Sequence, residues 1–323
     1  MTQLSYGHDG EHAYSLYYEH SGKVTPTGLI LGTAAGLAVG AAAGALYSLA
    51  VMNCPIIKLN ALLAIAFGAA VGASAVSMMR VGKVRSIQVS IATVAVITFL
   101  SYYFSWVVWL WMLLRNSSVQ IPFQSLLWRP DIVGRIILKV NEHGTWAMST
   151  YDKQATSGIT LWLVWLAEVG LIFGSSLICA KVLVKSKPFC ERCNRWCTGP
   201  VSLQRFKAAS AAEVRRHLES RDFAFFEQLG LATNQDAVAL QLIHHHCPQC
   251  RDLHTLSVEQ ITTTASKKGQ QKNTNLVVDK FLIAPEELQQ IQAITLESQW
   301  ARDEQRKAAG ARARGIPQPP GNS

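Results

Sequence analysis

The chain has 323 residues, of which 49% are hydrophobic and 16% charged, and its formal net charge is +9. An average soluble domain carries about 25% charged residues. The shortage is local, because residues 1–185 hold 12 basic and 7 acidic residues whereas residues 186–323 hold 18 and 14. This distribution predicts a membrane region followed by a soluble domain, with buried core helices of a soluble protein as the alternative.

Four long stretches of low charge follow a polar N-terminal segment, residues 1–26. The stretches cover residues 27–52, 61–79, 87–114 and 159–184. Each is close to or longer than the roughly 20 apolar residues that a helix needs to cross a bilayer core. We therefore predict a four-helix transmembrane domain over residues 27–185. The first stretch starts too late and is too long for a signal peptide, so we expect it to be retained.

Glycine recurs at every fourth position of the first stretch, and the second stretch repeats the spacing. In lipid, small residues at this spacing let two helices approach closely, and packing then holds them together. We predict that the two stretches form an antiparallel hairpin held by a glycine zipper. The alternative is that part of the glycine face packs between protomers, in a homo-oligomer or a pore. The predicted packing residues are Gly28, Gly32, Gly36, Gly40, Gly44, Gly68 and Gly72.

An ionisable residue, Glu168, lies near the middle of the fourth stretch. A charged side chain is costly at this depth, so such a residue is a candidate functional site. The central parts of the stretches hold no basic residue, which leaves Ser101, Tyr102 and Ser105 as available partners. We expect a protonated carboxyl that donates a hydrogen bond to another helix. Proton or ion coupling and contact with a partner protein are the alternatives.

Basic residues in short loops indicate the orientation, because lysine and arginine favour the cytoplasmic side. The loop after the second stretch and the segment after the fourth are both rich in them, and four spans return the chain to the side where it began. We predict a multi-pass protein of the cell (inner) membrane with both termini cytoplasmic. Loop 115–158 is then extracytoplasmic. It contains a short amphipathic helix, starting at Pro130 and stopping at Gly144, that is expected to lie on the membrane surface or against the bundle.

Two CxxC pairs follow the last stretch. Two such turns can aim four sulfurs at one ion, an arrangement that suits tetrahedral Zn²⁺. We predict a structural zinc site, with iron, a redox dithiol and disulfides as alternatives. Four protein ligands leave no open position for catalysis. The predicted ligands are Cys190, Cys193, Cys247 and Cys250, with Cys197, His244, His245 and His246 as nearby alternatives.

Strand-like sequences flank CPQC, which places the second cysteine pair at the tip of a hairpin. This arrangement resembles the knuckles of zinc-ribbon domains, and it implies a zinc-ribbon-like domain over residues 186–284. A helical insertion in that domain opens with a capping box at Ser210 and Glu213 and closes at Gly230. Residues 267–275, KKGQQKNTN, are expected to be a flexible connector before a third strand.

A helix over residues 285–309 and a disordered tail over residues 310–323 are predicted to end the chain. With its FCERC and CPQC knuckles and its four spans, the chain as a whole resembles uncharacterised bacterial multi-pass membrane proteins that end in a zinc-ribbon-like domain. That resemblance implies a location in the membrane and names no activity.

The sequence contains no phosphate-binding glycine loop, HExxH motif, nucleophile elbow or pair of catalytic carboxylates, so we assign no catalytic residue. The leading hypothesis is a non-enzymatic integral membrane protein that presents a cytoplasmic structural-zinc domain to a protein partner, as a scaffold, adaptor or regulator. The alternative is an oligomeric transporter or channel built on the glycine zipper, with Glu168 as its polar element. The basic surplus of residues 186–323 is too small to predict nucleic-acid binding.

Overall fold

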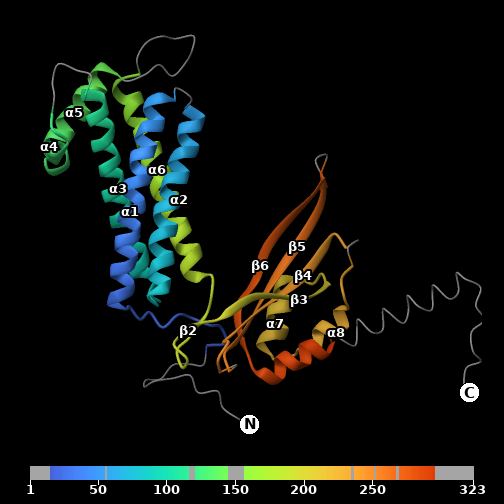
Figure 1. Cartoon of the computed structure of the whole chain (residues 1–323). Helices are drawn as coiled ribbons and strands as arrows, with labels where there is room; N and C mark the ends of the chain where they lie inside the picture. Colours follow the sequence, from blue (N-terminus) through green and yellow to red (C-terminus); the bar gives the residue numbers. More distant parts are fainter. Residues whose placement is uncertain are drawn as a thin grey trace, which may run out of the picture. The chain divides into compact units, whose positions relative to one another are not determined.

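The structure is a computed structural model, and it describes residues 15–54, 57–115, 121–144, 156–233, 236–250, 252–266 and 269–294. The chain forms two compact units (Figure 1). One unit, His20–Ser186, is helical. The other combines Met1–Glu19 with Lys187–Ser323 and contains all of the described strands. We call them the helical unit and the sheet unit.

Four long helices make up most of the helical unit. They are α1 (Pro26–Asn53), α2 (Ile57–Val81), α3 (Ile87–Arg115) and α6 (Gly158–Lys185). All four are long and apolar enough to cross a membrane, which indicates a multi-pass membrane protein as the sequence predicts. Their ends fall within a few residues of the predicted ones, and α2 begins earlier because the apolar run is preceded by residues that also favour a helix.

The glycine face of α1 is turned into the bundle, where all five glycines are buried. A Cβ atom added to Gly36 would lie 2.9 Å from the Cβ of Ala75 on α2 and 3.0 Å from Ile97 on α3. A Cβ on Gly44 would lie 3.3 Å from the carbonyl oxygen of Ser101 on α3. The glycines of α1 therefore allow close approach to two helices of the same chain.

Gly68 and Gly72 of α2 contact a different helix from the one predicted. A Cβ on Gly68 would overlap the carbonyl oxygen of Ile172, and one on Gly72 would lie 2.9 Å from the carbonyl carbon of Ser176. Both neighbours are on α6, so the predicted contact of these two glycines with α1 is wrong. The reason is that α2 packs against both α1 and α6. It carries small residues on two faces, and it meets α1 through positions such as Ala75.

Two short helices, α4 (Phe123–Trp128) and α5 (Pro130–His143), pack against one end of α3. The helix α5 begins at Pro130 and stops at Gly144, which has a φ of 79°, as the sequence predicts. The helix α4 is not predicted by the sequence pattern, because six residues are too few to display a helical period. Its C-terminal carbonyls accept a hydrogen bond from Tyr103, whose hydroxyl lies 3.0 Å from the oxygen of Leu126.

The sheet unit is built on one antiparallel sheet whose strands lie in chain order (Figure 1). The four strands are β3 (Thr198–Lys207), β4 (Val238–His246), β5 (His254–Ser266) and β6 (Gly269–Ile283). A separate two-stranded hairpin consists of β1 (Phe189–Cys190) and β2 (Arg195–Trp196).

Helices α7 (Ala211–Glu219) and α8 (Phe225–Leu229) connect β3 to β4, and residues 285–294 form a helix after β6. The Ser210 hydroxyl accepts a hydrogen bond from the Glu213 amide at 3.2 Å, so the predicted N-cap is present. These helices and the sheet share one hydrophobic core, whose largest buried side chains include Phe206, Phe226, Leu240, Phe281 and Ile291.

The predicted connector at residues 267–275 is largely strand. From Gly269 onward these residues belong to β6 and pair with β5, for example Asn273 with Thr262. Residues 271–276 of β6 are exposed, so no buried face imposes an alternation of apolar and polar side chains. Without that alternation the sequence carries no strand signal, and the pairing with β5 forms the strand instead.

The N-terminal segment takes part in the sheet unit. Tyr17 forms a bridge with Phe281 of β6, and the Tyr18 amide donates to the carbonyl oxygen of Lys280 at 2.9 Å. The Leu282 amide donates to Leu16 at 2.8 Å. Residues 16–18 thus add to the edge of the sheet, which the prediction of a separate polar segment did not anticipate.

Candidate metal centre

The four predicted cysteine ligands lie on two turns. Cys190 and Cys193 belong to the β1–β2 hairpin, and Cys247 and Cys250 to the turn between β4 and β5. In the second turn the Cys247 amide donates to the carbonyl oxygen of Leu253 at 3.0 Å, which closes the loop. Each turn therefore places two sulfurs on one side of a tight backbone loop.

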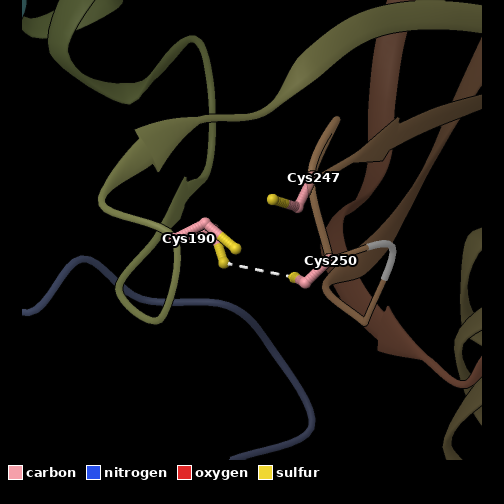
Figure 2. Close-up of side chains that lie close together, drawn as sticks. Cys190, Cys247 and Cys250 are labelled. Atoms are coloured by element: carbon pink, nitrogen blue, oxygen red, sulfur yellow. Dashed lines mark hydrogen bonds between the residues drawn. The ribbon is translucent and has the colours of Figure 1, made fainter.

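The sulfur atoms of the four cysteines lie within 4.8 Å of one another. The Sγ atoms of Cys190 and Cys250 are 3.7 Å apart, and Figure 2 shows the labelled side chains converging from the two turns. A tetrahedral ion with metal–sulfur bonds of about 2.3 Å separates its ligands by about 3.8 Å. A disulfide would need about 2.05 Å. The geometry therefore fits a bound metal ion.

Hydrogen bonds to sulfur support the same conclusion. Burial raises the pKa of the Cys247 thiol, but the backbone N–H groups of Cys250 and Gln249 outweigh burial and bring that pKa down to about 7. The Asp252 amide lies 3.5 Å from the Cys250 sulfur. Burial raises the pKa of Cys190. Several thiolates this close repel one another, and a divalent cation would compensate that charge.

An ion pair joins the two turns outside the cysteines. Arg192, in the first turn, contacts the carboxylate of Asp252, just after the second turn. Both side chains are at least partly exposed, so the pair contributes little stability by itself. It links the two turns on their solvent side.

Tyr18 supports the first turn from the other side, and the sequence did not reveal this role. Its hydroxyl accepts a hydrogen bond from the Phe189 amide at 2.8 Å and lies 3.2 Å from the Phe189 carbonyl oxygen. Its ring packs against the cysteine cluster. Successive side chains of an extended segment point to opposite sides. The Tyr17–Tyr18 pair in an otherwise polar segment is the signal that could have predicted one tyrosine in each direction.

The alternative cysteine and histidine ligands lie outside the four-sulfur group in the part of the chain that the structure describes. Cys197 is buried beside it, and burial raises the pKa of its thiol to about 12. His244 Nε2 lies 2.9 Å from His254 Nδ1, and His246 Nε2 lies 3.1 Å from the Thr198 hydroxyl. His244 and His246 thus each direct one ring nitrogen to a residue other than the four cysteines.

Glu168 faces two tyrosines in the helical unit. Tyr47 of α1 is positioned to donate a hydrogen bond to its carboxyl, and Tyr102 of α3 is close enough to interact with it electrostatically. Of the three predicted partners, Tyr102 is near the carboxyl, whereas the Ser105 hydroxyl donates to the Tyr102 carbonyl oxygen at 2.7 Å. Ser101 faces Gly40 instead.

No family model matches the chain, and neither the curated proteins nor the solved structures contain a match to it. The fold and the site define its class in general terms. The chain combines four helices able to span a membrane with a sheet unit in which four cysteines could hold a metal ion.

Proposed function

We propose that this chain is a non-enzymatic integral membrane protein whose sheet unit, folded around a structural Zn²⁺ ion, faces the cytoplasm and binds a protein partner. The observation that carries the proposal is the convergence of two distant turns into one four-sulfur group. Four cysteine ligands complete the coordination of a tetrahedral zinc ion and leave no position for a substrate.

Zinc is the metal that the ligand set supports best. Soft sulfur ligands in a tetrahedral arrangement select zinc or iron, and zinc has no redox chemistry that would require further groups. The ion joins the β1–β2 hairpin to the β4–β5 turn, so its binding energy contributes directly to folding of the unit.

The contacts of the N-terminal segment support the proposal that both ends of the membrane domain lie on the same side of the membrane. Tyr17 pairs with β6, and four candidate spans lie in the chain between them. An even number of crossings returns the chain to its starting side. Arg80 at the end of α2, with Lys83 and Arg85 in the following turn, favours the cytoplasm for that side. Reduced thiols, as a zinc site needs, also belong to that compartment.

The exposed end of the β5–β6 hairpin is the surface that we assign to the partner. Strand β6 lies at the edge of the sheet. In the part of the chain that the structure describes, its outer side pairs with residues 16–18, and only near Phe281. Residues 271–276 are exposed, and Leu276 is 51% exposed. An open edge of this kind accepts an extended segment of another protein as an added strand.

Packing of the α1 glycines favours an anchor over a pore built on a glycine zipper. Gly36 and Gly44 contact α2 and α3 of the same chain. A zipper-built oligomer would instead need this glycine face free for another protomer.

Site-specific photocrosslinking in native membranes tests the proposal. A photoreactive residue at Leu276 is expected to capture one protein reproducibly, whereas the same residue at Val201, 42% exposed on β3, is the matched control. Replacing Cys247 with serine should abolish that crosslink, and Glu168→Gln should keep it. A crosslink that survives Cys247→Ser, or equal capture at both positions, would contradict the proposed function.

A further inference from the structure

A partly open cavity of about 200 Å³ lies in the helical unit, between α1, α2, α3 and α6. An apolar cavity of about 150 Å³ is large enough to admit benzene. The present cavity therefore has room for an aromatic ring with a short substituent. The lining residues that matter for its chemistry are Tyr47, Asn60, Trp106, Trp109, Trp165 and Glu168.

Tryptophans form much of the wall. The ring of Trp106 lies 5.1 Å from that of Trp165 at an angle of 87°, and 5.6 Å from that of Trp109 at an angle of 78°. Rings at right angles form a corner, so they enclose a ligand from more than one direction. The face of an indole ring carries negative charge density and attracts cations, most strongly where water is excluded.

Two of the side chains that line the cavity, Glu168 and Asn60, bring acceptor oxygens to it. Glu168 is the only acidic residue in the four long helices, and among the residues that the structure describes no lysine or arginine lines the cavity. The Asn60 side-chain oxygen is buried and has no hydrogen-bond partner among the described residues. An unpaired buried acceptor is costly unless a ligand supplies the donor. A carboxyl and an amide oxygen together suit a group that carries both positive charge and N–H donors.

We infer that this cavity is a binding site for a small apolar ammonium ion, such as a protonated arylalkylamine. The ammonium group donates hydrogen bonds to Glu168 and Asn60, and the apolar body lies against Trp106 and Trp165. The Tyr47 hydroxyl orients the carboxylate. This site is independent of the four-cysteine centre, and the proposed partner binding does not depend on it.

Binding replaces the proton on the Glu168 carboxyl with the positive charge of the ammonium ion. In the empty cavity the carboxyl keeps its proton, because an unpaired charge is costly in this environment. When the ammonium ion enters, the carboxyl releases that proton and the net charge of the site stays the same. Among the described residues, the titratable groups that face Glu168 are Tyr47 from α1 and Tyr102 from α3. From α2 the cavity receives Asn60, which does not titrate. Affinity for the cation should therefore fall as the pH is lowered.

Binding of 2-phenylethylamine to the full-length protein in lipid nanodiscs tests the inference, with 2-phenylethanol as the neutral ligand of matching shape. Tryptophan fluorescence and saturation-transfer NMR report occupancy. We expect the ammonium ion to bind roughly tenfold more tightly than the alcohol at pH 8, and less tightly at pH 5.5. Glu168→Gln should remove both the preference and the pH dependence.

Two controls separate the site from partition into the bilayer and from misfolding. Glu142→Gln removes a carboxyl from α5, outside the cavity, and should leave binding unchanged. Trp165→Phe keeps an aromatic wall and should retain the preference for the cation with a lower affinity. Equal affinities for the amine and the alcohol, or unchanged binding in Glu168→Gln, would overturn the inference. Zinc content does not enter the readout, so failure here leaves the proposed function standing.

Discussion

The sulfur atoms of Cys190 and Cys250 lie 3.7 Å apart, although 60 positions separate the two residues in the chain. Cys190 ends strand β1, whereas Cys250 lies in the turn between β4 and β5. Bringing them together requires β3 and β4 to pair, because these two strands connect the two turns. The four-sulfur group and the fold of the sheet unit are therefore coupled, and that coupling leads to several measurable consequences.

Removing the Tyr18 hydroxyl should weaken the first turn. In Tyr18→Phe the Phe189 amide loses its 2.8 Å partner at a buried position, a loss of about 1–3 kcal/mol. We expect faster loss of zinc to a chelator, measured with a colorimetric zinc indicator. The matched control is Tyr17→Phe, because the Tyr17 hydroxyl bonds to Glu219 at an exposed site. Similar release rates for the two variants would contradict the role of Tyr18.

The two glycine positions of α2 that face α6 should tolerate no larger residue. In Gly72→Ala the new methyl group would meet the backbone of Ser176, which cannot move without separating the two helices. We expect destabilisation of about 1–3 kcal/mol, seen as a lower Tm of the protein in detergent. Gly174→Ala is the control, because no atom lies within 4 Å of its added Cβ. A Tm that falls as far in Gly174→Ala would show that helix packing is not the cause.

His244 should make the sheet unit sensitive to acid. Burial, followed by the neighbouring His254, lowers the pKa of His244 from 6.5 to about 4. The unfolded chain then binds the proton more readily than the folded one. The contribution of His244 to the free energy of unfolding is therefore complete above pH 6.5. It is lost as the pH falls from 6.5 towards 4, by up to about 3 kcal/mol.

The difference between wild type and His244→Gln isolates this contribution, because both proteins keep the same four cysteines. We expect urea unfolding of wild type to become easier between pH 6.5 and 5, and the dependence to be shallower in the variant. His143→Gln, at the end of α5, should follow the wild type. Parallel curves for wild type and His244→Gln would exclude a buried neutral His244.

Local patterns in the sequence predicted the long helices, the cysteine turns and the Ser210 cap, because each depends on residues that are close in the chain. The partners of those elements depend on long-range packing. Gly68 has the same spacing as the glycines of α1, yet its neighbour is Ile172 on α6. Spacing shows that a helix has a small face but does not name the helix that meets it.

The candidate site was predicted in the same partial way. Its four cysteines carry their own spacing signal, whereas Tyr18 lies far away in the sequence and contacts Phe189 only after the sheet has formed. The strand over residues 269–275 was missed because strand pairing, and not an apolar alternation, makes it a strand. The cavity beside Glu168 depends on side chains from four helices, and no local pattern describes such a space.

The metal content of the purified full-length protein tests the central claim most directly. We expect close to one zinc ion per chain by inductively coupled plasma mass spectrometry, with iron nearly absent. Cys247→Ser should lose the zinc, and Cys197→Ser should keep it because Cys197 lies outside the four-sulfur group. A native protein without metal, or zinc that remains in Cys247→Ser at the wild-type level, would contradict a sheet unit built around this ion.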